Sequence, residues 1–170
     1  SERPRFSSRQ AIMQFCIDAS QRNSREGGGP FAAAVVEDGE QLVALGVNLV
    51  LPASSSILHG ELVALLLAQR RLGTPVLDPE RHMLVTSCAP CVMCWGALTF
   101  AGIGELVCGA ATTDAERAGF DEGDKPGDWR RLLEQRGIAV AEDVERPAAR
   151  EVLLEYARSG GVIYTGPFSP

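Results

Sequence analysis

The stretch Pro90-Cys91-Val92-Met93-Cys94 places two cysteines three positions apart, directly after a proline. On a helix, this spacing brings both sulfur atoms onto one face of the first turn. Proline suits a helix start because the N–H that it lacks would have no partner there. The free N–H groups and the positive end of the helix dipole lower the pKa of a thiol in this position. The stretch therefore predicts two thiolates that hold a metal ion together with further ligands.

The upstream stretch His59-Gly60-Glu61 supplies complementary groups. The imidazole of His59 offers a third ligand, and three protein ligands leave the fourth zinc position to water, as in catalytic zinc sites. Residues two positions apart do not share a face in the middle of a helix. At a first turn, however, the histidine can point along the axis while the glutamate leans towards the metal-bound water. The spacing predicts that Glu61 carries protons and is not a ligand.

Composition limits the class of protein. With 170 residues and 45% hydrophobic content, the chain suits one domain with a sizeable core. A formal net charge of −6 argues against a large nucleic-acid interface, which is normally basic. Five cysteines form no evident disulfide framework, which favours a reducing, cytoplasmic location. We expect neither a secretion signal nor a membrane span, because no apolar run has the required length.

Apolar periodicity predicts alternating helices and strands. Helices are expected at 8–23, 61–72, 91–101, 129–136 and 148–158, and strands at 31–36, 41–47, 82–86, 106–110 and 138–141. Asp38-Gly39 predicts a hairpin between the first two strands. The helices at 61–72 and 91–101 are apolar almost all round, so we expect both to be buried. The alternation predicts a single three-layer α/β domain over residues 1–170, ending in a tail at 160–170.

Several reactive side chains have simpler explanations than chemistry. Cys16 lies on the apolar stripe of the first predicted helix and Cys108 lies in a predicted strand, so both are expected to be core thiols. His82 is expected at the end of a strand, and Trp95 is expected to pack. Asn48 follows a strand, where asparagine is commonly a turn former.

His-x-Glu followed by Pro-Cys-x-x-Cys is the signature of zinc-dependent nucleobase deaminases. The sequence resembles the cytidine deaminase-like superfamily and, within it, is most similar to bacterial guanine deaminases. Besides the two motifs, the segments that carry the resemblance are residues 29–35, Asn48, residues 86–88 and residues 114–122. The last of these ends in Ala-Gly-Phe-Asp-Glu, which is typical of this subgroup. The resemblance implies an α/β/α fold with a central five-stranded mixed sheet.

The resemblance also implies roles for individual residues. A Zn²⁺ ion is held by His59, Cys91 and Cys94, and Glu61 takes a proton from the zinc-bound water and passes it to a ring nitrogen. Glu122 matches a second acidic residue placed near the exocyclic amine.

The remaining implied contacts concern the substrate and the assembly. Phe31 packs against the base, Asn48 hydrogen-bonds its edge, and the tail closes over the pocket through Tyr164. The implied reaction is hydrolysis of guanine to xanthine and ammonia, carried out by a homodimer.

Two positions depart from the family pattern. Residue 60 is usually alanine, and the residue before Pro-Cys is usually glutamate; here they are Gly60 and Ala89. Both are expected in or beside the base pocket, where Gly60 leaves room for a larger or shifted ring and Ala89 removes a carboxylate. Neither is a zinc ligand, so we expect an active deaminase whose ring specificity these two positions affect.

Other functions remain open at this point. The substrate can be another amino-substituted ring, namely guanosine, ammeline or a related aminotriazine, a pterin or cytosine. A tRNA adenosine deaminase shares the signature, but the acidic composition argues against the basic rim that such an enzyme needs. A non-catalytic binding module with a closed structural zinc site would take Cys88 as its fourth ligand, but it would have no use for Glu61.

Overall fold

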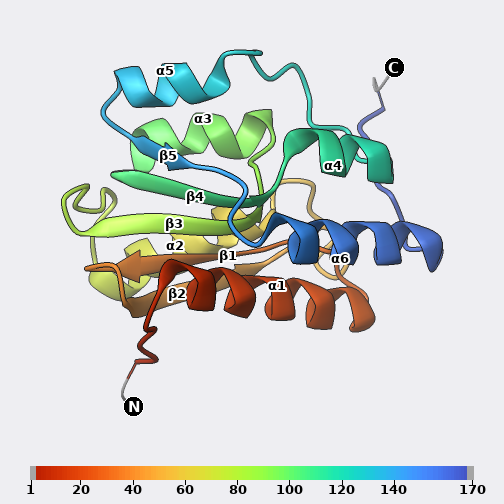
Figure 1. The fold of residues 1–170 in the computed structure, drawn as a ribbon, viewed down its shortest axis with the longest axis horizontal. Coiled ribbons are helices and arrows are strands. Elements are labelled where there is room, and N and C mark those ends of the chain that lie inside the picture. The colour runs from red at the N-terminus through yellow and green to blue at the C-terminus, as the bar shows by residue number, and fades with distance from the viewer. Residues whose placement is uncertain (1–2, 168–170) are drawn as a thin grey trace.

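In the computed structural model, which describes residues 3–167, a five-stranded sheet lies between two layers of helices (Figure 1). The part of the predicted tail after residue 167 lies outside the described residues. The strands are β1 (Ala32–Glu37), β2 (Gln41–Val47), β3 (His82–Cys88), β4 (Glu105–Ala110) and β5 (Ala139–Ala141). The helices are α1 (Arg9–Arg25), α2 (Gly60–Leu72), α3 (Val92–Ala101), α4 (Thr112–Ala118), α5 (Trp129–Gln135) and α6 (Arg146–Arg158).

The sheet is mixed, as predicted. Its strand order is β2-β1-β3-β4-β5, with β1 antiparallel to both neighbours and β3, β4 and β5 parallel. The β1–β2 hairpin turns at Asp38 and Gly39, whose φ angles of 53° and 76° are both left-handed, as a tight turn of the type I′ class requires. No bound of a predicted helix or strand differs from the observed one by more than two residues.

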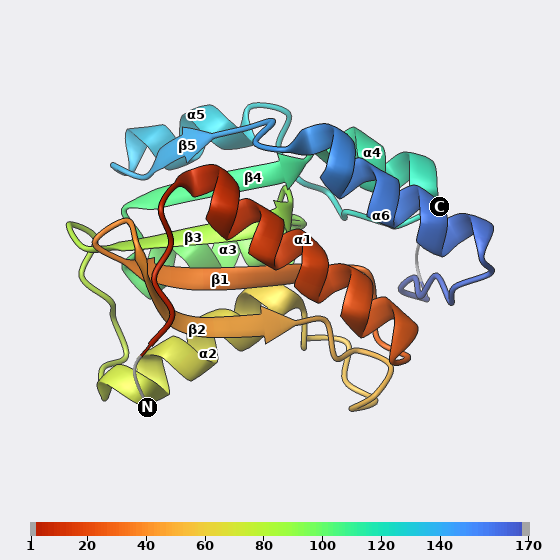
Figure 2. The same cartoon turned by 60° about the horizontal axis from the view of Figure 1, so that its bottom comes forward.

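Each face of the sheet has its own core. Helices α1 and α6 cross one face, and α2 and α3 cover the other (Figure 2). Ile12 and Leu153 belong to the first core, and Leu65 and Leu98 to the second. All four side chains are buried, so the long strands at the centre are covered on both sides.

One helix was not predicted. Helix α4 has only seven residues and is held by a charged side chain from a distant part of the chain. The carboxylate of Asp114 accepts from the backbone N–H of Ala111 at 2.9 Å and from Arg146 Nε of α6 at 2.8 Å. This contact fixes the direction of α4 and of the segment that follows it, Gly119 to Glu122.

The expectation that the helices at 61–72 and 91–101 are wholly buried is wrong for the single chain. Leu66 and Leu67 of α2 are 42% and 43% exposed, and Phe100 of α3 is 79% exposed. Each helix buries one side against the sheet and leaves an apolar side uncovered. Neither these helices nor any other in the described part of the chain is long and apolar enough to cross a membrane.

We expect Asp114→Asn to lower the free energy of unfolding at pH 7 by about 1–3 kcal/mol, because it breaks a charged hydrogen-bond pair at a buried carboxylate. Burial raises the pKa of Asp114, but the hydrogen bonds from Arg146 and Ala111 outweigh burial, and the net pKa is lowered. A lowered pKa stabilises the fold above the pKa of the unfolded carboxyl and loses that effect as the pH falls through the folded pKa.

Urea unfolding at several pH values measures this difference, which should shrink below about pH 4. The matched control is Asp143→Asn, since Asp143 pairs with the same Arg146 but is 61% exposed. An exposed pair contributes about 0–1 kcal/mol. Equal effects of the two substitutions would contradict the role given to Asp114.

Candidate metal centre and substrate pocket

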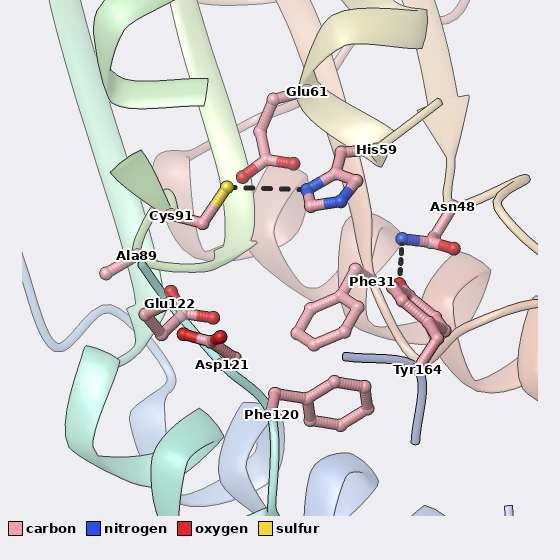
Figure 3. Close-up of a pocket in the computed structure, with 10 residues that line it drawn as sticks. All are labelled: Phe31, Asn48, His59, Glu61, Ala89, Cys91, Phe120, Asp121, Glu122 and Tyr164. Atoms are coloured by element: carbon pink, nitrogen blue, oxygen red, sulfur yellow. Dashed lines mark hydrogen bonds between the residues drawn. The ribbon is translucent and has the colours of Figure 1, made fainter. Parts of the chain in front are cut away.

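Two helix N-termini bring three metal-ligating side chains together. His59 is the N-cap of α2 and Cys91 is the N-cap of α3, both with extended backbone, and Cys94 lies in the first turn of α3. His59 Nδ1 lies 3.4 Å from Cys91 Sγ and 3.6 Å from Cys94 Sγ (Figure 3 draws the first contact). Cys91 therefore precedes the helix, whereas the sequence placed it inside the first turn.

The donor set fits a zinc ion. All three ligand atoms lie within 4.8 Å of one another. Zinc at about 2.3 Å from sulfur and about 2.0 Å from nitrogen, in tetrahedral geometry, separates the two by about 3.5 Å. The distances of 3.4 and 3.6 Å match this value. Hydrogen bonding from Cys94 and from His59 outweighs burial and lowers the pKa of Cys91 to about 4, while the same bond between the two cysteines raises the pKa of Cys94, so that Cys91 is the thiolate of the pair in the absence of metal.

Cys88 is not part of this group. Its thiol is buried and donates to the carbonyl oxygen of Ala111 at 3.8 Å. Among residues 3–167, the group of ligating atoms contains His59, Cys91 and Cys94 alone. A closed structural site that uses Cys88 as its fourth ligand is therefore wrong for this arrangement.

Glu61 lies beside the ligands without joining them. It is the second residue of α2, its residue is only 7% exposed, and its carboxylate faces Cys91 and His59 (Figure 3). Burial raises the pKa of Glu61, and the negative charge of Cys91 raises it further. A carboxylate in these surroundings takes up a proton more readily than an ordinary glutamate does.

A pocket opens next to the ligands. It is lined by Phe31, Asn48, His59, Glu61, Ala89, Cys91, Phe120, Asp121, Glu122 and Tyr164 (Figure 3). The rings of Phe31 and Phe120 meet edge to face at 4.8 Å and form an apolar wall. The pocket thus has a flat hydrophobic side and polar groups around it, which suits a planar aromatic ring.

Glu122 contributes a buried carboxylate from the segment after α4. Its oxygen Oε2 has no hydrogen-bond partner among the described residues. Burial, and then the negative charge of Cys91, raises the pKa of Glu122 to about 8. An orphaned buried oxygen in a pocket calls for a ligand group, because such atoms are normally paired.

Asn48 and Tyr164 close the side of the pocket opposite Glu122. Asn48 Nδ2 donates to the Tyr164 hydroxyl at 2.5 Å. Asn23, which the sequence did not single out, donates to the carbonyl oxygens of Gly29 and Asn48, both at 2.8 Å. An asparagine near the end of a predicted helix, shortly before a run of glycines, is the signal that the sequence offered for this supporting role.

Gly60 is not among the residues that line the pocket, although its neighbours His59 and Glu61 are, so its effect on the space for the ring stays a prediction. A Cβ atom at Gly60 would lie 3.1 Å from the Cα of Ala32. The missing methyl therefore faces the sheet and lets α2 begin close to β1. Ala89 does line the pocket, as expected. Phe120 and Asp121 also line it, although the sequence had assigned them no role.

Comparisons with known proteins agree with this geometry. Residues 6–110 match the cytidine and deoxycytidylate deaminase zinc-binding region. The guanine deaminase of Bacillus subtilis is 39% identical over 111 residues, which cover 62% of this chain and 69% of that protein. The solved guanine deaminase from Nitrosomonas europaea is 41% identical with a TM-score of 0.89, and the match covers 93% and 89% of the two chains. A solved protein in complex with 2,6-diaminopurine is 43% identical with a TM-score of 0.89, over 94% of this chain and 87% of that one.

We expect Cys91→Ser to lose bound zinc, because a serine hydroxyl is a poor replacement for a thiolate ligand. Zinc content per chain after dialysis, measured by mass spectrometry, checks this. Cys88→Ser is the matched control, since it alters a neighbouring buried thiol outside the ligand group and should keep the metal. Full zinc occupancy in Cys91→Ser would remove this residue from the ligand set.

Proposed function

Because the chain belongs to the cytidine and deoxycytidylate deaminase zinc-binding family, we propose that it hydrolyses the exocyclic amine of guanine to give xanthine and ammonia. The observation that supports guanine most strongly is the pocket, where an apolar wall, a buried Glu122 and the metal ligands surround one small space. The similarity to two guanine deaminases over most of the chain supports the same ring.

Each side of the pocket has a task in this reaction. His59, Cys91 and Cys94 would hold a zinc ion, and that ion would supply activation of water as a nucleophile at neutral pH. Glu61 receives the proton released beside the ligands and delivers it to the ring nitrogen next to C2 of guanine. Its raised pKa suits this shuttle, because the carboxyl must both accept and return a proton.

The other residues hold the base and its leaving group. Phe31 and Phe120 pack against the ring, and the Asn48 side chain bonds its edge. Glu122 exchanges a proton with the departing amine, and its burial, which raises its pKa, favours the protonated form that such a donor needs. Because residue 89 is alanine, the pocket has no further carboxylate at this position beside Glu122.

We propose that the described part of the tail, residues 160–167, opens to admit the base and closes over it. The present cavity has a volume of about 30 Å³, which is enough for one or two water molecules. The Tyr164 hydroxyl takes the Asn48 donor that a base would otherwise use. Movement of Tyr164 would free both the space and the hydrogen-bond donor.

We also propose that residues 1–170 act as one domain in the cytoplasm. The described part of the chain shares a single sheet with a core on each face, which supports one domain. All five cysteines are buried and free of disulfide bonds, which supports a reducing compartment.

A homodimer formed through α2 and α3 would cover the apolar sides that the single chain exposes. The exposed groove there is lined by Leu62, Leu65, Leu66, Gln69, Pro75, Ala97, Phe100 and Ala101. We expect Phe100→Glu to shift the protein from dimer to monomer, because a charge cannot be buried unpaired at such a surface. Light scattering coupled to gel filtration measures this, with the exposed Glu80→Gln as control, and a monomeric wild type would contradict the proposal.

The reaction is tested by ammonia release from the zinc-loaded protein. Guanine is compared with guanosine, ammeline, cytosine and adenine, and chromatography identifies the purine product. We expect guanine to be turned over fastest and xanthine to accumulate. Turnover of another ring, with none of guanine, would keep the family chemistry and reject the proposed substrate.

We expect Glu61→Gln to retain zinc and to lower kcat by about 10²–10⁴-fold, because an amide cannot carry the proton. Zinc content and guanine turnover are measured on the same sample, so that loss of metal is separated from loss of proton transfer. A rate close to that of the wild type would reject the proton role of Glu61.

Glu122→Gln should lower kcat for guanine by about 10²-fold, since it removes the proposed donor to the leaving amine. The control is Glu116→Gln, an exposed glutamate on the neighbouring α4 whose substitution should leave turnover unchanged. If both variants turn over guanine at the wild-type rate, Glu122 has no part in the reaction.

A further inference from the structure

Lys125 is the single lysine of a chain whose lysine and arginine residues total 16. It is half-buried at the end of the segment that carries Glu122. Its Nζ donates to the carbonyl oxygen of Pro90 at 2.7 Å and to Thr112 Oγ1 at 2.5 Å, and it lies 4.6 Å from the ring centroid of Trp129. The ammonium group has three N–H donors, and it makes two hydrogen bonds and one cation–π contact here.

The partners of Lys125 come from separate parts of the chain that meet around its ammonium group. Pro90 directly precedes the proposed ligand Cys91, and Thr112 begins α4. Trp129 begins α5 and accepts through its carbonyl oxygen from Trp95 Nε1 of α3 at 3.1 Å. One side chain thus links the loop before α3 to the first residues of α4 and α5.

The segment that carries Glu122 is attached to the ligand loop at further points. The N–H of Val92 donates to the Glu122 carbonyl oxygen at 3.0 Å. Gly123 has a φ angle of 70°, and a Cβ there would lie 2.5 Å from Val92 Cγ1. The backbone of residues 122–123 therefore runs close against Val92, and Lys125 adds a hydrogen bond two residues further on.

We propose that Lys125 is a positioning residue, which holds the Glu122 segment against the loop that carries Cys91. The inference rests on the proposed function for the roles of Glu122 and Cys91. Without the amine, the Pro90 carbonyl and the Thr112 hydroxyl lose their common donor, and the contacts between the two segments are weakened at this point.

Arginine is a poor replacement for Lys125. Its planar fork of N–H groups suits a carboxylate or phosphate, whereas the three contacts of Lys125 converge on one nitrogen atom from different directions. A role that depends on positive charge alone would be met by either residue. The Lys125→Arg variant therefore separates positioning from charge.

The test compares Lys125→Met, Lys125→Arg, Thr112→Val and the double variant Lys125→Met/Thr112→Val. The control is Arg131→Met, which removes an exposed positive charge from nearby α5. Three quantities are measured: the rate of zinc release to a chromogenic chelator, hydrogen exchange of peptides from residues 120–126, and kcat and KM for guanine.

We expect Lys125→Met to bind zinc but to release it about tenfold faster than the wild type. Its kcat for guanine should fall about tenfold while KM changes by less than about threefold, because misplaced groups impair catalysis more than substrate binding. Exchange at 120–126 should rise. Thr112→Val should show a smaller effect, and the double variant should match Lys125→Met within about twofold, because the two groups share one contact. Lys125→Arg should not restore the wild-type values, and Arg131→Met should equal the wild type.

Zinc release and exchange in Lys125→Met within about twofold of the wild type would overturn the inference. So would full rescue by Lys125→Arg, or a double variant whose effect is the product of the single effects. If Lys125→Met lowers the melting temperature but leaves zinc release, hydrogen exchange at 120–126 and kcat unchanged, Lys125 contributes to stability only and the inference is wrong. If the wild type does not act on guanine, the proposed function fails, while zinc release and exchange still decide the role of Lys125.

Discussion

The N-termini of α2 and α3 converge beside the end of β3, and their closeness depends on how near α2 can come to the sheet. A Cβ at Gly46 of β2 would lie 2.2 Å from both the Gly60 carbonyl oxygen and the Ala64 nitrogen. A side chain there would push α2 away. Since His59 caps α2 and Cys91 caps α3, the same displacement would separate the nitrogen and sulfur ligands, which now lie 3.4 Å apart.

The site brings buried acidic groups close together, and positively charged side chains lie near them. Glu61 and Glu122 are both buried near Cys91, and burial raises the pKa of each carboxyl. The charge of His59 opposes this effect at both carboxyls, and the ammonium of Lys125 opposes it at Glu122. A zinc ion held by the three ligands would favour the charged forms further.

Local patterns predicted the strands and the metal ligands, because a continuous apolar run and the spacing of a metal motif are both properties of neighbouring residues. The strand at 41–47 has the predicted bounds. Properties that depend on distant residues could not be predicted in this way. Helix α4 depends on Arg146, the methyl that Gly60 lacks would face Ala32, and Lys125 reaches Pro90 across 35 positions. The exposure of Phe100 follows from the arrangement of whole helices.

X-ray absorption at the zinc edge distinguishes an open from a closed zinc site, since it counts the ligands of the bound metal. For an open site we expect two sulfur atoms at about 2.3 Å and two lighter atoms at about 2.0 Å, which are the His59 nitrogen and a water oxygen. Three sulfur atoms in the shell would mean that Cys88 closes the site. That result would contradict an open zinc centre, and with it the hydrolytic role given to the pocket.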